Sequence, residues 1–417
     1  MVLLFLRLKG QETSIEVDIT SHVNIETGFN ELYEKLYGTP PPDRPIEIES
    51  LRVLSAVKEK TQVDLIDTRN IHKPVPYKSK QVYSQGKWKP CDVYRWEDLT
   101  PGIELRGPAL VTSNNSTLLV ENGWKFVLSR NQNAELMKFR GYSGTSNYSK
   151  EAELELYMNR FTAIANNMGA VLQRTSFSVN VKERLDFSCA LLDRNGFLIV
   201  NAPHIPVHLG SLGVCVRAVS KVLPLHAGDV VITNHPAYGG SHLPDITLIK
   251  SVYFKGSLVG YVANRAHHAE IGGRQPGSMP VDATTLVEEG VIIPPTYLVR
   301  GGKTNWKRIE QLLTAGPFPT RLVHENIADL SGALASLAAG ENLLEKLCAQ
   351  YGVEEVTRNM QRIFDLSTSY VNTLLKKFPN RTLKAVERLD DGSELSVKMY
   401  KKGRFLHIDF DGTSGLH

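Results

Sequence analysis

Histidines gather in one stretch of this chain, and their spacing to an aspartate suits metal binding. Seven of the twelve histidines lie between residues 201 and 270. Within that stretch His242 and Asp245 precede an apolar run, and a second apolar run ends at His267 and His268. Imidazole and carboxylate groups are ligands that zinc, manganese and iron accept in proteins.

The two apolar runs, residues 246–254 and 257–265, flank a Lys-Gly turn and are predicted to pair as an antiparallel hairpin. If Lys255 and Gly256 form the centre of the turn, the pairing of the two strands places Asp245 opposite Ala266 and diagonal to His267. Opposed residues in such a hairpin are ~5 Å apart and diagonal ones ~7 to 8 Å apart. The ends of the two strands should therefore bring their polar residues together.

We expect His242, Asp245 and His267 to converge there as three ligands of a divalent metal, with open positions for water or substrate. The alternative is that these side chains only hydrogen-bond one another at a sheet end. His268 faces the opposite side of its strand from His267, although a turn could bring it back as an acid or base. His204 and His208 are four residues apart, but Pro203 and Pro206 argue against a helix there. These two are interpreted as loop histidines, either hydrogen-bonded and buried or lining the pocket.

The elements around this stretch indicate an α+β fold. Residues 1–139 show short apolar runs broken by turn residues, with a helix over 29–36, which predicts a β-rich first domain. The small polar residues of 140–150 are typical of a linker. From 151 to 417 helical and strand patterns mix without a strict βαβ rhythm, so a larger mixed α/β domain is expected.

Within the second domain, the spacing of apolar residues predicts specific elements. Helices are expected over 154–172, 321–351 and 353–378, and a hairpin over 187–200. Further strands are expected over 230–232 and in 383–410.

Composition excludes several classes of protein. The net charge of +4 is spread over 417 residues without a block of like charge, so nothing indicates nucleic acid. No apolar stretch reaches the ~20 residues that span a bilayer. The four scattered cysteines indicate neither a disulfide framework nor a thiolate metal site, and they favour a cytoplasmic protein. Phosphate-binding loop and nucleophile-elbow motifs are absent from the sequence.

A set of linked motifs resembles the hydantoinase B/5-oxoprolinase family over residues 151–417. These are Arg174–Ser178, Lys182–Ala190, Pro203–Ser211, Gly239–Asp245, Ala263–His268, Gly277–Pro280 and Glu289–Gly290. The first domain resembles the C-terminal part of hydantoinase A, through Gly107–Val111, Asn115–Thr117 and Glu121–Trp124. An A-type part followed by a B-type part is the order of fused 5-oxoprolinases, and Asn234–Pro236 strengthens that likeness over the related carboxylases.

The resemblance implies ATP-dependent opening of a cyclic amide, with 5-oxo-L-proline, ATP and water giving L-glutamate, ADP and phosphate. By similarity, His242, Asp245 and His267 would be the metal ligands. His268 stays the candidate acid or base if a turn brings it back to the pocket. Asn234, Ser241 and Arg265 are assigned to substrate binding, because an arginine can hold a carboxylate or phosphate through paired bonds.

The resemblance also implies that the family's nucleotide-binding domain would precede this chain, so that Mg-ATP would bind only in the complete enzyme. The B-type match is still running at Gly412–Ser414, which predicts a truncated second domain. A-type or identical subunits are the expected partners. The alternatives are an N-methylhydantoinase, a related carboxylase subunit, or an inactive fragment with an assembly role.

Overall fold

The computed structural model describes residues 1–11, 13–20, 24–37, 40–41, 44–55, 74–84, 87–129, 131–138, 150–202, 205–403 and 405–415. The chain forms two compact units, one of Met1–Ser55 together with Glu153–His417 and the other of Ala56–Ala152. The expected linker at 140–150 lies outside the described residues except for Lys150. The division into domains at 139 and 151 stays a prediction.

The apolar N-terminus forms the middle strand of a small antiparallel sheet of order β2-β1-β3. The expected helix is confirmed, and it buries Phe29 and Tyr33 against the apolar residues of the central strand. The elements are β1 (Val2–Leu8), β2 (Ile15–Asp18), α1 (Ile25–Tyr37) and β3 (Ile46–Val53).

The unit of residues 56–152 is rich in strands, as expected. Its strands form a four-stranded sheet of order β4-β5-β7-β8 and a three-stranded sheet of order β10-β9-β6, around Val111, Val120 and Phe126. The elements are β4 (Lys78–Ser84), β5 (Lys87–Arg95), the 3-10 helix η2 (Trp96–Asp98), β6 (Glu104–Arg106), β7 (Ala109–Thr112), β8 (Thr117–Val120), β9 (Trp124–Leu128) and β10 (Ala134–Lys138).

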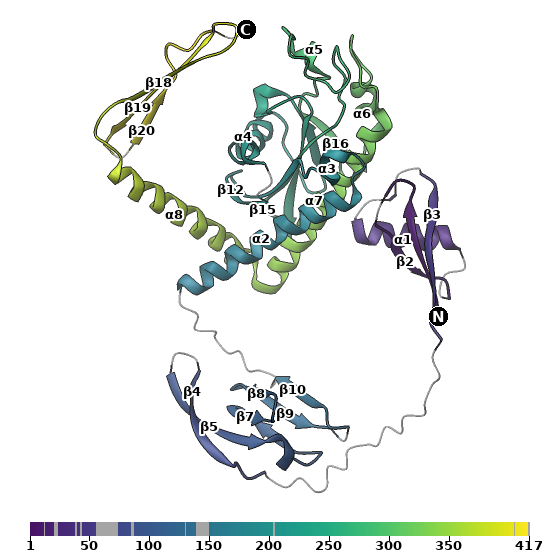
Figure 1. The fold of residues 1–417 in the computed structure, drawn as a ribbon, viewed down its shortest axis with the longest axis vertical. Helices are drawn as coiled ribbons and strands as arrows, with labels where there is room; N and C mark the ends of the chain where they lie inside the picture. Colours follow the sequence, from purple (N-terminus) through teal and green to yellow (C-terminus); the bar gives the residue numbers. More distant parts are fainter. Residues whose placement is uncertain are drawn as a thin grey trace. The chain divides into compact units, whose positions relative to one another are not determined.

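The centre of the other unit is a seven-stranded sheet of order β12-β11-β15-β14-β13-β16-β17 (Figure 1), in which every neighbouring pair is antiparallel. The antiparallel pairing confirms an α+β arrangement. The strands are β11 (Phe187–Asp193), β12 (Leu198–Asn201), β13 (Val230–Thr233), β14 (Asp245–Phe254), β15 (Ser257–His267), β16 (Thr296–Arg300) and β17 (Lys303–Thr304).

Helices pack on both faces of this sheet. Alternate residues of β15 point to opposite faces. Tyr261 and Ala263 join an apolar cluster with Leu212 of α4, and we call this side the α4 face. Val262 and Ala266 join a larger cluster with residues of α2 and α7, and we call this side the α7 face. The helices and 3-10 helix are α2 (Lys150–Thr175), α3 (Val179–Lys182), α4 (Pro206–Val222), η3 (Pro236–Tyr238), α5 (Leu286–Glu289), α6 (Trp306–Leu313), α7 (Val323–Tyr351) and α8 (Val353–Lys377).

The expected β14–β15 hairpin is confirmed, but its register at the far end differs from the expectation. Near the turn the pairing agrees, because Phe254 faces Ser257. The register then shifts between Val252 and Tyr253, as at a β-bulge. Asp245 consequently lies directly opposite His267 and not opposite Ala266.

Helix α4 was not expected from the sequence, because Pro203 and Pro206 were interpreted as helix breakers. The helix begins at Pro206, where a proline fits since its fixed φ suits the first turn and its missing N–H would have no helical partner. His208 is therefore a helical residue, while Pro203 and His204 lie outside the described residues.

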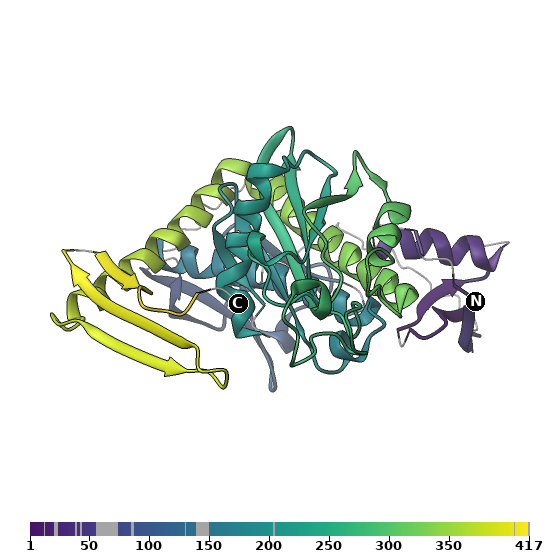
Figure 2. The ribbon, with the colours of Figure 1, turned by 90° about the horizontal axis from the view of Figure 1, so that it is seen from above.

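After the long helices α7 and α8, which confirm two expectations, the chain forms a separate three-stranded sheet of order β18-β19-β20, yellow in Figure 2. Its strands are β18 (Leu383–Arg388), β19 (Glu394–Lys402) and β20 (Phe405–Asp409). No helix in the described part of the chain is long and apolar enough to cross a membrane.

Candidate metal centre

Two histidines and an aspartate meet at the end of the β14–β15 hairpin. Oδ1 of Asp245 lies 2.8 Å from Nδ1 of His267, and Oδ2 lies 3.1 Å from Nδ1 of His242. One possible ligand atom from each of the three residues lies within 4.8 Å of the other two. The structure thus brings together the three residues that the sequence predicts as ligands.

A third imidazole supports the aspartate. His208 of α4 is buried, with Nδ1 3.1 Å from Oγ of Ser188 and Nε2 3.6 Å from Oδ2 of Asp245. Sequence reasoning gave this histidine no definite role because it placed His208 in a loop. The recurrence of Leu212, Cys215, Val216 and Val219 at helical spacing was the signal that could have revealed α4.

The carboxylate of Asp245 is both buried and ionised. Burial alone would raise its pKa, but hydrogen bonds with His208 and His267 outweigh burial and hold the pKa well below its usual range. Burial lowers the pKa of His267, but the contact with Asp245 is stronger and the net shift is upward. The site therefore has a fixed negative charge between imidazoles, of which the His242 side chain is 55% exposed.

This donor set fits a divalent cation. Two imidazole nitrogens and one carboxylate oxygen suit zinc, manganese or iron, and the exposure of His242 leaves one side of the group open to solvent. The contacts of His208 resemble the outer hydrogen bonds that orient ligands in metal sites.

The loop before His242 packs too closely for side chains at its two glycines. Gly239 has a φ of 84°, and a Cβ there would lie 2.8 Å from the backbone N of Cys215 in α4. At Gly240 a Cβ would lie 2.4 Å from the carbonyl oxygen of Asn234. The loop is thereby held against α4 and the end of β13.

Asn234 lies beneath this loop. Its buried amide donates to the carbonyls of Leu243 and Val291 and accepts from the backbone N–H of Ile293. The side chain thus joins backbone segments, and its predicted contact with substrate stays a prediction.

Arg265 lies on the α4 face, fully buried. Its guanidinium donates to Thr247, Ser211, Ser241 and the carbonyl of Gly239, at distances of 2.6 to 3.0 Å. Ser241, half-buried, is thus bonded to Arg265. Their predicted substrate contacts likewise stay predictions.

His268 points to the α7 face, where it is 2% exposed. Nδ2 of Asn326 lies 3.1 Å from Nδ1 of this ring and also donates to the carbonyl of Glu270, while Thr320 donates to the amide oxygen. These bonds fix the amide orientation, so Nδ1 of His268 accepts and the ring proton sits on Nε2. Burial lowers the pKa of His268, which keeps the ring neutral.

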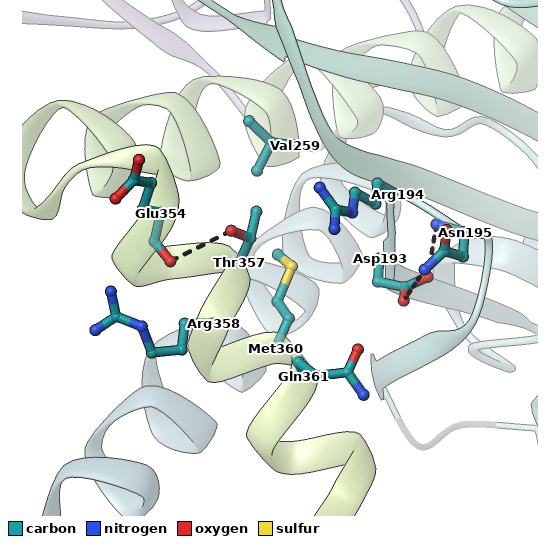
Figure 3. Close-up of a pocket in the computed structure, with 9 residues that line it drawn as sticks. All are labelled: Asp193, Arg194, Asn195, Val259, Glu354, Thr357, Arg358, Met360 and Gln361. Atoms are coloured by element: carbon teal, nitrogen blue, oxygen red, sulfur yellow. Dashed lines mark hydrogen bonds between the residues drawn. The ribbon is translucent and has the colours of Figure 1, made fainter.

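A polar hollow of about 380 Å³ lies elsewhere, between the turn after β11 and helix α8 (Figure 3). Its lining includes Val259, near the turn end of β15, whereas His267 ends the same strand. The two residues are eight positions apart along the strand, or about 26 Å at 3.3 Å per residue. The hollow shares no lining residue with the three-residue metal group.

Comparison with known proteins places these features in a family. The model of the hydantoinase B/oxoprolinase family matches residues 150–416, and that of the hydantoinase/oxoprolinase C-terminal domain matches residues 15–139. The chain is 35% identical to 5-oxoprolinase 1 of Arabidopsis thaliana and 34% identical to 5-oxoprolinase of Saccharomyces cerevisiae, in each case over 99% of this chain. It spans 35% and 34% of the length of these relatives.

Among solved structures, the fold is similar to that of the ATP-dependent caprolactamase from Pseudomonas jessenii. The TM-score is 0.57 with 28% sequence identity, and the match covers 63% of this chain and 46% of that chain.

Proposed function

We propose, on the premise that the chain belongs to the hydantoinase B/oxoprolinase family, that it is part of an ATP-dependent cyclic amide hydrolase of the 5-oxoprolinase type. The proposed reaction converts 5-oxo-L-proline, ATP and water to L-glutamate, ADP and phosphate. The observation that carries this proposal is the group formed by His242, Asp245 and His267 at the open end of the hairpin.

In this proposal the three side chains hold a divalent zinc, manganese or iron ion. Such an ion polarises a carbonyl oxygen and lowers the pKa of a bound water. Asp245 supplies the negative charge of the site, and His208 and Ser188 orient its carboxylate. The exposed side of His242 is where a small cyclic amide would approach.

The surroundings of His268 bear on the acid or base role predicted for it. Its Nδ1 is occupied by Asn326 and its ring is buried on the α7 face. A neutral ring with a proton on Nε2 can donate a hydrogen bond, which is the role that its contacts support.

ATP chemistry in this proposal belongs to the complete enzyme, with Mg-ATP bound by a hydantoinase A-type nucleotide-binding part. Either an A-type subunit or further copies of this chain would be the partners. The cytoplasmic location predicted from the sequence belongs to the same proposal.

Metal content of the purified chain tests this function first. Plasma mass spectrometry should find close to one zinc, manganese or iron per chain, with loss in folded His242→Ala and His267→Ala variants. His226→Ala, which changes an exposed histidine, is the matched control and should keep the metal.

The second step adds an A-type subunit and measures glutamate release from 5-oxo-L-proline and ATP. Release that depends on both chains and on His242 supports the proposal. Ring opening of N-methylhydantoin to its N-carbamoyl amino acid, without glutamate release from 5-oxo-L-proline, would keep the reaction class and change the substrate. A folded wild-type chain that binds none of the three metals would contradict the proposal.

A further inference from the structure

Arg265 carries a buried positive charge whose hydrogen bonds go to neutral oxygens. The residue is 0% exposed. Nε donates to the Thr247 hydroxyl at 2.7 Å, Nη1 to the hydroxyls of Ser211 and Ser241 at 2.6 and 3.0 Å, and Nη2 to the Gly239 carbonyl at 2.7 Å. Burying a guanidinium is costly unless its donors are satisfied. Four hydrogen bonds satisfy most of the donors of this buried guanidinium and hold it in one position.

These bonds connect three parts of the fold. Thr247 belongs to the neighbouring strand β14 and Ser211 to helix α4. The other two partners, Gly239 and Ser241, flank Gly240 in the loop that leads directly into His242. One side chain therefore ties that loop to the sheet and to the helix.

His242 needs such support more than the other two ligands do. Asp245 and His267 are fixed by the strand pairing in which they face each other. His242 lies outside any strand. Its ring contacts Asp245 through Nδ1 and meets the His267 ring edge-on, and its backbone exchanges hydrogen bonds with Asp245. Its position depends on the loop before it.

A guanidinium suits this task better than an ammonium group. Its five N–H groups lie in one plane and diverge from three nitrogens, so a single group can reach acceptors on three elements. A lysine offers three donors on one nitrogen and cannot span the same set.

We propose that Arg265 is a positioning residue that locks the Gly239–Ser241 loop and so fixes His242 for metal binding. The inference rests on the proposed function only in treating His242 as a ligand. It reassigns the role that the sequence suggested for Arg265, because paired bonds to a substrate anion need two N–H groups and four of the five are already bonded within the fold.

The test uses the full chain with Arg265→Lys and Ser241→Ala. We expect amide hydrogen exchange of residues 239–242 to accelerate at least tenfold in both variants without added metal. The dissociation constant for Mn²⁺, measured by electron paramagnetic resonance, should rise by about 10- to 100-fold, as for other outer contacts of metal sites.

Arg217→Lys is the matched control. Arg217 is a residue of α4. Like Arg265 it donates from its guanidinium to a glycine carbonyl in a turn, with Nη1 2.9 Å from the carbonyl oxygen of Gly196. Neither loop exchange nor Mn²⁺ binding should change in this variant. Ser211→Ala removes a bond to α4 but none to the loop, so its effect should be smaller than that of Ser241→Ala.

Unchanged exchange at 239–242 in both Arg265→Lys and Ser241→Ala would overturn the inference, as would a rise in substrate KM without any change in exchange. If wild type binds no metal but the loop exchange accelerates in both variants, the positioning role holds and the proposed function fails. If Arg265→Lys does not fold, the half-buried Ser241 decides the question through its alanine variant.

Discussion

His267 and His268 are adjacent in the sequence, yet they lie on opposite faces of one sheet and in different environments. On the α4 face, the His267 side chain is 19% exposed and contacts the ionised Asp245. On the α7 face, His268 is 2% exposed and bonded to the amide of Asn326. The alternation of a β-strand thus separates a candidate ligand from a buried histidine bonded to an amide.

Polar groups on the two faces also bond to different partners. On the α4 face, Asp245 contacts the side chains of three histidines. On the α7 face, Asp329 accepts from the backbone N–H groups of Phe177 and Ser178, at 2.6 and 3.0 Å, and so shapes the turn after α2. We infer that charge on the first face serves ligand binding and that charge on the second serves folding.

The largest expected effect is on metal binding by Asp245→Ala. Loss of the central carboxylate removes a proposed ligand and leaves the neighbouring histidines without their shared acceptor, so affinity should fall more than 100-fold. Calorimetric titration with Zn²⁺ or Mn²⁺ measures this. Asp282→Ala, at a carboxylate 65% exposed, is the control and should bind as wild type does.

Paired variants of the adjacent histidines test the comparison directly. His267→Ala should weaken metal binding by roughly 10- to 100-fold with little loss of stability, on the scale known for disturbed metal sites. His268→Ala should keep the metal affinity and lower the free energy of unfolding by about 2 kcal/mol, because it leaves a buried amide unpaired. Loss of metal by a folded His268→Ala chain would break the distinction between the faces.

Much of this organisation could be predicted from residue patterns. The helical pattern of apolar residues continues for more than three turns in α2, α7 and α8, so these helices could be predicted. The Lys-Gly turn between two apolar runs predicted the hairpin. The grouping of His242, Asp245 and His267 followed from that hairpin because all three lie beside its open end.

Other features depended on tertiary contacts that no local pattern records. The bulge near Val252 lies beside Gly260, but a glycine inside a strand does not by itself fix where the pairing shifts. Pro206 was compatible with both a break and a helix start, so the role of His208 was missed. From the sequence Arg265 was assigned to anion binding. Its burial and its four partners could not be predicted, because the partners come from separate elements of the fold.

A smaller effect is expected from Asp329→Ala. The change leaves two buried N–H groups without their acceptor, which should lower the free energy of unfolding by about 1 to 3 kcal/mol. Urea denaturation measures the change. Metal affinity should remain within twofold of wild type, and a larger loss would show that the α7 face also supports the ligands.

The smallest effect concerns two buried thiols. Burial raises the pKa of Cys189, on the α7 face, to about 12, and it also raises the pKa of Cys215, which packs against Gly239. Both should resist iodoacetamide at pH 8, but Cys215 should react a few times faster because opening of the loop uncovers it. Peptide mass spectrometry gives the two rates, and equal rates would contradict this difference.

The register shift near Val252 determines which face of the sheet His267 occupies. Residues that face each other across two strands share a face, and a one-residue slip exchanges the faces of one strand. The extra residue near the turn therefore sets the parity by which His267 shares a side with Asp245, from about 26 Å away at 3.3 Å per residue. Deleting that extra residue would make the pairing regular and keep His267 opposite Asp245. A slip that closes the bulge at full strand length would instead place Ala266 opposite Asp245 and turn His267 toward α7.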